Sequence, residues 1–296
     1  MTTPKSLRGS RRETEMPRSI DINPTAVCNL RCSFCWGPDH TLPDGLNTDE
    51  WKELIRFLAE HGSQAVVFTG GEPLVRNDIG ELLRCAHEVG LHVTLSTNTL
   101  LLRRRAADVI PYIDEIGIPL DGSSREANAR MRLGNPRQFA TAIDALHLIC
   151  ARRPNIHATV RTVVSKVNKH DIVNIGAVLS HHHMSWDRWK LYQFVPVSIG
   201  ASHRDEHEIT TADFQKIVSD VIEAWPSLPI EGQSADTRVG RYLFIGPEGE
   251  VYGVDSDGSY SRIGSWIELV EGKLTESVRE IVSSSKNNRH GAKHCA

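Results

Sequence analysis

The sequence predicts an α/β fold with a parallel sheet, on the basis of two observations. Between residue 20 and about residue 197, short runs rich in β-branched residues alternate with longer amphipathic segments. This alternation is typical of βα units, in which a helix connects two parallel strands. Polar motifs also follow several of the predicted strands, where parallel α/β folds place their functional sites. We therefore expect a site at the carboxyl ends of the strands.

Six segments are expected to be strands because they are short, apolar and rich in β-branched residues. They are Ser19–Asn23, Ala65–Thr69, His92–Thr97, Glu115–Leu120, Ile156–Val164 and Trp189–Val195. The segments between them have the apolar spacing of helices. These are Thr48–His61, Asn77–Val89, Leu101–Val109, Pro136–Ala151 and His170–His182. Thr48 is expected to cap the first helix, with Glu53 near its first turn, and Gly90 is the stop signal of the second.

The chain changes character after Pro196. A polar loop leads into a helix that Thr210 or Thr211 is expected to cap, and "GPEGE" is a turn signal between two alternating runs, which predicts a hairpin. We expect three parts: a flexible N-terminal arm at residues 1–18, an α/β core at residues 19–197, and a small α+β extension at residues 198–296.

The composition excludes several classes of partner. Among 296 residues, 37 acidic and 34 basic side chains give a formal charge of −3, without the basic clustering expected for binding nucleic acid or anionic membranes. No apolar run approaches the ~20 residues of a membrane-spanning helix, and the N-terminus lacks the apolar region of a secretory signal. Six cysteines, three of them clustered, favour reduced thiols over disulfides. We therefore expect a cytoplasmic protein that binds small molecules or peptides.

The stretch "PTAVCNLRCSFCWGPDH" places Cys28, Cys32 and Cys35 within eight residues, directly after a predicted strand. Thiolates at this spacing wrap around one corner of a compact inorganic cluster, whereas tetrahedral zinc sites usually consist of two separated cysteine pairs. A cluster with one iron that the protein leaves without a ligand is therefore favoured. Three incidental thiols, or a zinc ion completed by His40, are the alternatives.

The remaining cysteines are poor candidates for a fourth ligand. Cys85 and Cys150 fall within helical patterns, where packing is the expected role of a free cysteine, and Cys295 lies in a polar tail. The consecutive histidines at His181–His183 would point in different directions on a helix, so they favour a loop or a helix end over a second metal site.

The sequence "CNLRCSFC" after one strand, followed by "FTGGEP" at the end of the next, resembles the radical S-adenosylmethionine (radical SAM) superfamily. The resemblance covers Ile20 to about Pro196. It implies a partial (β/α)6 barrel with a small C-terminal α+β extension, and a [4Fe–4S] cluster held by Cys28, Cys32 and Cys35. It also implies that the amino and carboxylate groups of S-adenosylmethionine chelate the fourth iron, which would explain the missing fourth cysteine.

The resemblance further implies a set of residues that bind S-adenosylmethionine. They are Phe34 beside the last cysteine, Gly70, Gly71, Glu72 and Pro73 at the methionine amino group, Ser96 and Asn98 at the ribose or carboxylate, Arg132 at the carboxylate, and Val195 beside adenine. Arg130 is the rival for the role of Arg132. Asn168, at the exit of the fifth strand, is expected to be a turn residue near the cofactor.

The segment "WDRWKLYQFVPVS" at the sixth strand is similar to viperin-like nucleotide-modifying enzymes. Arg188 and Lys190 are therefore candidates to contact an anionic substrate, with an ordinary solvent-facing position as the alternative. Thr159 and Arg161 differ from the lysine and asparagine that those enzymes carry on the fifth strand. Cytidine triphosphate is therefore not the expected substrate.

The predicted hairpin resembles the start of the extension that binds auxiliary clusters in peptide-modifying radical SAM enzymes, a SPASM-like extension. Cysteines for an auxiliary cluster do not follow it at the required positions. We therefore expect the hairpin to cover the open side of the barrel and to offer Tyr252, Asp255, Asp257 and Tyr260 to a substrate, with a purely structural role as the alternative.

The resemblance implies that an electron delivered to the cluster cleaves S-adenosylmethionine, and that the resulting 5′-deoxyadenosyl radical takes a hydrogen atom from the substrate. A small-molecule substrate is expected, such as a nucleoside or sugar derivative of a biosynthetic pathway, with an electron donor such as flavodoxin or ferredoxin. A peptide-modifying maturase without auxiliary clusters is the second hypothesis, and a zinc or iron–sulfur sensor protein is the non-enzymatic one. The sequence identifies no catalytic side chain, because the cofactor supplies the difficult chemistry.

Overall fold

The computed structural model describes residues 16–133, 135–152, 155–181, 186–238, 243–254 and 260–274. All six expected strands are present, as β1 Ser19–Ile22, β2 Ala65–Phe68, β3 His92–Ser96, β4 Glu115–Pro119, β5 His157–Val164 and β6 Arg188–Gln193. Four further strands follow them, β7 Ile230–Gln233, β8 Leu243–Ile245, β9 Glu250–Val254 and β10 Tyr260–Ser265. The sequence did not predict β7, because its four residues "IEGQ" carry only one large apolar side chain.

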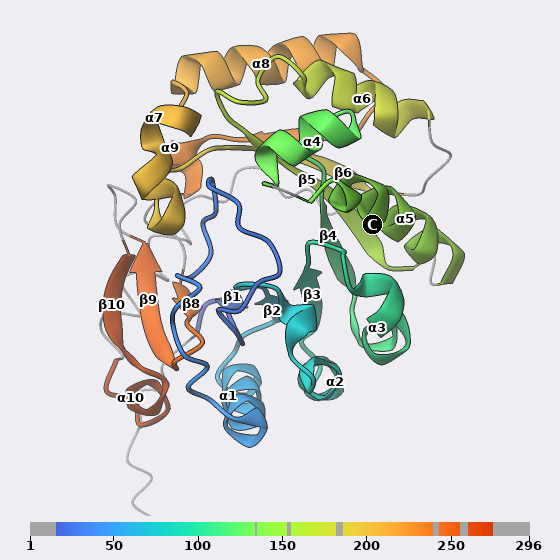
Figure 1. Ribbon diagram of the computed structural model, residues 1–296. Helices are drawn as coiled ribbons and strands as arrows, with labels where there is room; N and C mark the ends of the chain where they lie inside the picture. Colours follow the sequence, from blue (N-terminus) through green and yellow to red (C-terminus); the bar gives the residue numbers. More distant parts are fainter. Residues whose placement is uncertain are drawn as a thin grey trace, which may run out of the picture.

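The strands form one ten-stranded sheet in the order β10-β9-β8-β1-β2-β3-β4-β5-β6-β7. All neighbours from β8 to β7 are parallel, and β9 and β10 add antiparallel pairs at one end. The sheet is open, since β10 and β7 are its two ends (Figure 1). The expected parallel α/β arrangement is therefore confirmed. The expected hairpin is confirmed as the antiparallel pair β8 and β9, to which β10 adds a third strand, and β8 joins this unit to β1.

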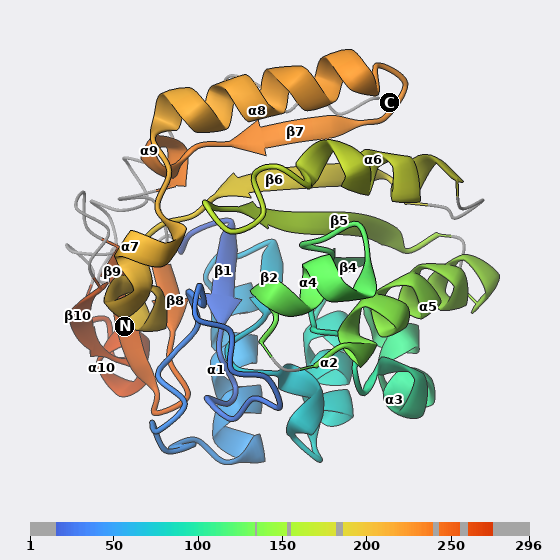
Figure 2. The same cartoon turned by 45° about the horizontal axis from the view of Figure 1, so that its top comes forward.

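The helices follow the predicted alternation with the strands. They are α1 Thr48–Glu60, α2 Ile79–Glu88, α3 Leu102–Val109, α4 Arg125–Met131, α5 Arg137–Arg152, α6 Ile172–His181, α7 Arg204–His207, α8 Thr211–Ala224, α9 Ala235–Arg238 and α10 Trp266–Val270, with 3-10 turns at Pro73–Val75, Ile110–Tyr112 and Ser198–His203. Figure 2 shows α1, α2, α3, α5, α6 and α8 along the outer side of the curved sheet. The described helices include none that is long and apolar enough to cross a membrane.

The start of α1 differs from the prediction by one residue. Asn47, not Thr48, is the cap: its side chain accepts from the N–H groups of Asp49 and Glu50, and Glu50 completes a capping box in place of Glu53. The Thr48 hydroxyl instead donates to Asp78 at 2.6 Å. Both residue types are good caps. The hydroxyl of Thr48 is engaged by Asp78, and Asn47 has Glu50 at the position that completes the capping box, so Asn47 caps the helix.

Other expected helix signals are confirmed. Gly90 follows α2 with φ +82°, a conformation that favours glycine. Thr210, one of the two expected caps of α8, accepts from the N–H of Asp213. The short helix α4 was not predicted, because its seven residues carry little apolar periodicity.

The two faces of the sheet differ in chemistry. The outer face packs against the helices in one large apolar cluster, in which Trp51 of α1 and Trp189 of β6 are fully buried. The inner positions of neighbouring strands instead carry polar side chains, among them Asp21 of β1, Ser96 of β3 and Arg161 of β5. Because a solvated or ligand-filled space tolerates polar groups and an apolar core does not, the inner side is where a polar ligand can bind.

The segment before β1 is anchored to the core. Met16 is 1% exposed and its N–H donates to the backbone of His61 at 3.0 Å. Ser63 donates to the carbonyl of Pro17 at 2.9 Å. Residues 1–15 of the expected arm lie outside the described residues.

Replacing Asn47 by alanine removes both side-chain hydrogen bonds at the start of α1 and should lower the free energy of unfolding by about 1 kcal/mol. Urea unfolding followed by circular dichroism measures this loss. The matched control is Asn47→Asp, which keeps an acceptor oxygen and should unfold within about 0.5 kcal/mol of the natural chain. Equal stability of Asn47→Ala and the natural chain would contradict the assignment of this cap.

Candidate active site

A cavity of about 350 Å³ opens at the carboxyl ends of the strands, on the inner side of the sheet. Most of the site residues expected from the sequence line it: Cys28, Cys32, Phe34, Cys35, Gly70, Gly71, Glu72, Ser96, Asn98, Arg132 and Val195. Pro73 does not line it but begins the 3-10 turn that follows Glu72. The cavity thus joins the cysteine loop to the ends of β1 through β6.

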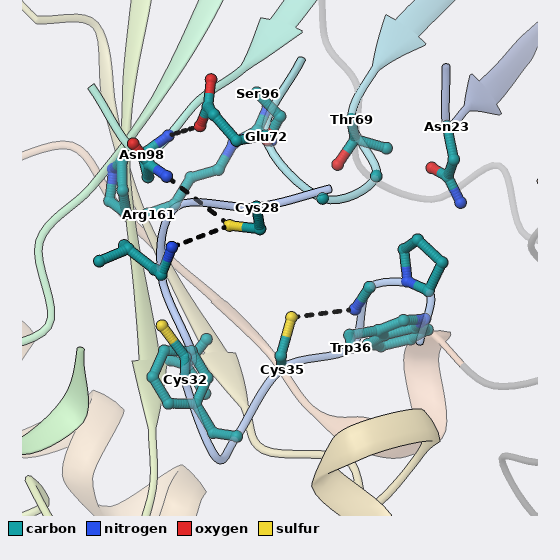
Figure 3. Close-up of a pocket in the computed structure, with 18 of the residues that line it drawn as sticks. Asn23, Cys28, Cys32, Cys35, Trp36, Thr69, Glu72, Ser96, Asn98 and Arg161 are labelled. Atoms are coloured by element: carbon teal, nitrogen blue, oxygen red, sulfur yellow. Dashed lines mark hydrogen bonds between the residues drawn. The ribbon is translucent and has the colours of Figure 1, made fainter. Parts of the chain in front are cut away.

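The three cysteine side chains surround a common space (Figure 3). The sulfur of Cys28 accepts from the N–H of Leu30 at 3.4 Å and from the side chain of Asn98 at 3.8 Å. The sulfur of Cys35 accepts from the N–H of Gly37 at 3.3 Å. Since hydrogen bonds to the sulfurs are one of the ways a protein tunes iron–sulfur clusters, these donors suit thiolate ligands.

Burial raises the pKa of all three thiols, and that of Cys32 to about 12. Thiolates in such a place need a positive partner, because burial disfavours the charged form. A metal centre supplies that positive charge, since metal ligands are thiolates and not thiols.

An iron–sulfur cube and a zinc ion require different arrangements of ligands. In a cube each thiolate binds a different iron atom, so its sulfurs lie apart, whereas tetrahedral zinc requires four ligands around one point. Among the described residues, no three His, Cys, Asp or Glu side chains converge closely enough to hold one metal ion. His40 lines the same cavity as the three cysteines.

The "GGE" segment is paired with the chain that leads into the cysteine loop. The N–H of Gly71 donates to Thr25 and the N–H of Glu72 donates to Val27, both at 2.9 Å. A Cβ atom on residue 71 would lie 2.4 Å from the Val27 oxygen, so only glycine allows this approach. Gly70 has φ +106°, which also favours glycine.

Glu72 is 1% exposed and accepts three hydrogen bonds. Its donors are the Thr97 hydroxyl at 2.7 Å and the N–H groups of Asn98 at 2.6 Å and Leu74 at 3.0 Å. Burial raises the pKa of Glu72, and the hydrogen bonds offset part of this rise. A carboxylate has about four acceptor positions. Within the described part of the chain, Asn98 is the one donor to Oε2, so this oxygen retains capacity for one more donor.

The two expected polar residues after β3 have different partners. The side chain of Asn98 donates to Asn29 at 2.6 Å, inside the cysteine loop. The hydroxyl of Ser96 accepts from the guanidinium of Arg161 at 2.8 Å. Asn98 is thus tied to the cysteine loop, and Ser96 to the interior of the sheet (Figure 3).

Arg132 lies in the cavity, whereas its rival Arg130 is exposed on α4 and does not line the cavity. Arg132 donates to the fully buried Asp121 at 2.7 Å, and its guanidinium lies 5.4 Å from the centre of the Phe34 ring. Burial alone lowers the pKa of Arg132, but the charge and hydrogen bond of Asp121, together with the charges of Cys32 and Cys35, outweigh it and the pKa is raised. The sequence did not identify Asp121, which has no motif of its own.

Asn168 is the turn residue that the sequence predicts, but it does not line the cavity. Its side chain accepts from the N–H of Ser165 and donates to the carbonyls of Asp121 and Val163. It therefore fixes the exit of β5.

His207 is a site neighbour that sequence reasoning missed. It is fully buried, and its Nε2 lies 2.7 Å from the hydroxyl of Ser33, between two cysteines of the loop. Its ring packs edge-on against Phe34, with 5.9 Å between the centroids. No pattern in the sequence around residue 207 indicates this contact, because it joins segments 174 residues apart.

The C-terminal strands contribute some of the expected groups. Tyr260 lines the cavity and donates to the carbonyl of Trp36 at 2.5 Å. Tyr252 does not line the cavity: it stacks on Phe244 and donates to Glu248. Asp255 and Asp257 lie outside the described residues, as do His182, His183 and Cys295.

The basic residues of β6 do not reach the cavity. Arg188 is more than half exposed and lies 3.6 Å from Glu231 of β7. This supports the solvent-facing alternative for Arg188. Lys190 lies two residues further along β6 and is half-buried.

Comparison with known proteins gives a family and a fold. The family described as "Radical SAM superfamily" matches residues 22–178. The AdoMet-dependent heme synthase of Methanosarcina barkeri is 31% identical over 216 residues, which are 69% of this chain and 58% of that protein. The S-adenosylmethionine-dependent nucleotide dehydratase of Lacinutrix mariniflava is 24% identical over 249 residues, which are 79% of this chain and 50% of that protein. The chain thus spans little more than half the length of these relatives.

The crystal structure of Streptococcus suis SuiB bound to the precursor peptide SuiA has the same fold, with a TM-score of 0.71 at 15% identity. The superposition covers 94% of this chain and 69% of that one. It confirms the expected partial-barrel fold of the radical SAM type. Because the family match covers more than half of the 296 residues, the chain belongs to the radical SAM superfamily, whose enzymes use a [4Fe–4S] cluster and S-adenosylmethionine.

Proposed function

We propose that this chain removes a hydrogen atom from a small polar molecule in the cytoplasm. One observation carries the proposal: the three clustered cysteines, Glu72 and the polar interior of the sheet all line the same cavity. When bound and reduced, the cluster and S-adenosylmethionine supply a 5′-deoxyadenosyl radical. A flavodoxin or ferredoxin is the proposed electron donor.

The residues around the cavity have separate proposed tasks. Cys28, Cys32 and Cys35 hold three irons. Glu72 accepts from the amino group of S-adenosylmethionine through its oxygen with spare capacity. Asn98 orients the loop by its bond to Asn29.

The remaining groups orient and shield the cofactor. Arg132, held by Asp121, faces the cofactor carboxylate, and Phe34 and Val195 cover its apolar parts. Tyr260, through its bond to Trp36, closes one side of the cavity and limits the entry of water. A radical intermediate needs such exclusion, because competing reactions would otherwise consume it.

A peptide substrate is the alternative. At 15% identity, the similarity to SuiB shows a shared fold and does not extend to the substrate. The polar side chains on the inner positions of the strands favour a small polar substrate instead, since they line the cavity itself. A nucleoside or sugar derivative is the substrate class that we propose first.

Anaerobic reconstitution tests the reaction class. The protein should bind about four irons per chain and release 5′-deoxyadenosine from S-adenosylmethionine when reduced. A colourless protein that binds zinc and releases no 5′-deoxyadenosine would refute the proposal. Deuterium transfer from labelled candidate substrates into 5′-deoxyadenosine, followed by mass spectrometry, then identifies the substrate.

Substitution of Cys28, Cys32 or Cys35 by alanine should abolish the visible absorbance of the cluster and the release of 5′-deoxyadenosine, because each thiolate is the ligand of one iron. Cys85→Ala is the matched control, since Cys85 is buried in α2 away from the cavity. It should retain iron content and cleavage. A cluster that survives any one of the three cavity substitutions would refute the ligand set.

Glu72→Gln should keep the cluster but weaken the binding of S-adenosylmethionine about tenfold or more, because an acceptor of a charged donor is lost. Anaerobic titration calorimetry on the reconstituted protein measures the dissociation constant. Glu81→Gln is the control, since Glu81 is half-exposed on α2 and pairs only with Lys52. Equal affinity of Glu72→Gln and the natural chain would reject the proposed role of Glu72.

A further inference from the structure

On the inner side of the sheet, the charged side chain of Arg161 reaches across a neighbouring strand to the next one. Arg161 of β5 is 22% exposed and crosses over β4, where a Cβ atom on Gly117 would lie 2.4 Å from its guanidinium carbon. Its Nη1 then donates to Ser96 of β3 at 2.8 Å. Gly117 thus allows the guanidinium to lie across the floor of the cavity that the cysteines also line.

The donors of this guanidinium are not saturated. Arg161 has five N–H groups, and among the described residues its hydrogen-bond partners are Ser96 and, at a long 3.4 Å, Glu115. Its Nε is buried and has no hydrogen-bond partner among the described residues. A buried donor without a partner is costly, so a native chain usually supplies one.

Two further buried polar atoms on the same cavity lack partners within the described part of the chain, Oδ1 of Asn23 and Nε2 of His40. Among the described residues, six buried side-chain atoms have no hydrogen-bond partner, and three of these six belong to residues that line this cavity. Their grouping around one cavity indicates a polar ligand, because buried polar groups in native structures usually have hydrogen-bond partners.

The charges around Arg161 select the kind of ligand. Asp21 of β1 is half-buried and lies near enough for the charge of Arg161 to act on it; burial raises its pKa to about 6, although the guanidinium opposes this rise. Burial also acts to raise the pKa of Glu115, but the charges of Arg161 and Lys190 and the hydrogen bonds from Thr159 and Arg161 together outweigh it, and the pKa is lowered. The two acids offset the charges of Arg161 and Lys190, so this part of the cavity has no excess positive charge for a dianion such as a phosphate monoester. A single negative charge is the better match.

We propose that Arg161 binds a carboxylate group of the substrate through its Nε edge, on the floor of the cavity and beyond the cofactor site. This inference rests on the proposed function, because it assumes that the substrate enters the cavity of the cysteines. It assigns to the substrate a free carboxylate, as in an acidic sugar or an amino acid. Arg132, not Arg161, remains the residue proposed for the cofactor carboxylate.

Anaerobic titration calorimetry tests this assignment on the reconstituted protein saturated with S-adenosylmethionine. Lactate, which carries a single carboxylate, is the probe, lactamide its neutral analogue, and inorganic phosphate the competing anion. Lactate should bind saturably, and lactamide and phosphate each about tenfold or more weakly than lactate. Arg161→Gln should weaken lactate binding by about the same factor, and Arg161→Lys should restore part of it.

Arg188→Gln is the matched control, because this arginine is exposed on the neighbouring strand and does not line the cavity. It should bind lactate as the natural chain does. All variants should keep the iron content and the affinity for S-adenosylmethionine, which shows that they are folded.

Several results would overturn the assignment. They are no lactate binding by the natural chain, equal binding by Arg161→Gln, tighter binding of phosphate, and loss of S-adenosylmethionine affinity in Arg161→Gln, which would make Arg161 a cofactor ligand. Failure of the proposed function has a different signature: natural protein that holds no iron or releases no 5′-deoxyadenosine. The two failures are therefore distinguishable.

Discussion

The site depends on one close contact between two backbones. The N–H groups of Gly71 and Glu72 bind the carbonyls of Thr25 and Val27, immediately before the first cysteine. This pairing fixes the entry to the cysteine loop against the exit of β2. Because a Cβ atom at position 71 would collide with Val27, the glycine is a geometric requirement of the pairing. The cysteines therefore inherit their position from the sheet and not from the loop alone.

Glu72 extends this constraint to the next strand. Its carboxylate accepts from Thr97 and Asn98 at the end of β3, while Asn98 reaches back to Asn29 in the cysteine loop. Three segments that are far apart in the sequence thus meet at one buried carboxylate. A buried charge is stable only when such donors compensate it. The same donors leave one oxygen of Glu72 with room for a cationic group, so structural support and the proposed binding role share one side chain.

The sequence predicted the parts of the site that lie in short motifs and missed those that lie between distant segments. The cysteines, the glycines and Glu72 stand in two local patterns, so their neighbourhood followed from the strand order. His207 lies beside Ser33 across 174 residues, and no local pattern encodes such a pair. Asp121 precedes Arg132 by only 11 residues, but no motif marks their pairing. A different reason explains the missed strand: the predicted strands are apolar, whereas β7 has a polar sequence because it is an edge strand with few positions to bury.

Residues that follow the expected end of the core, at residue 197, support the cysteine loop through hydrogen bonds. Gly200 donates to the carbonyl of Cys35 at 3.1 Å, and Ser198 donates to the carbonyl of Gly37 at 2.7 Å. His207 lies within hydrogen-bond distance of Ser33 inside the loop. Tyr260 of β10 donates to the carbonyl of Trp36, directly after the last cysteine. A loop that binds a cluster must keep its sulfurs fixed while the cluster changes charge, because reorganisation would oppose electron transfer. The segment after residue 197 therefore supports the cysteine loop directly, through hydrogen bonds to its backbone and side chains.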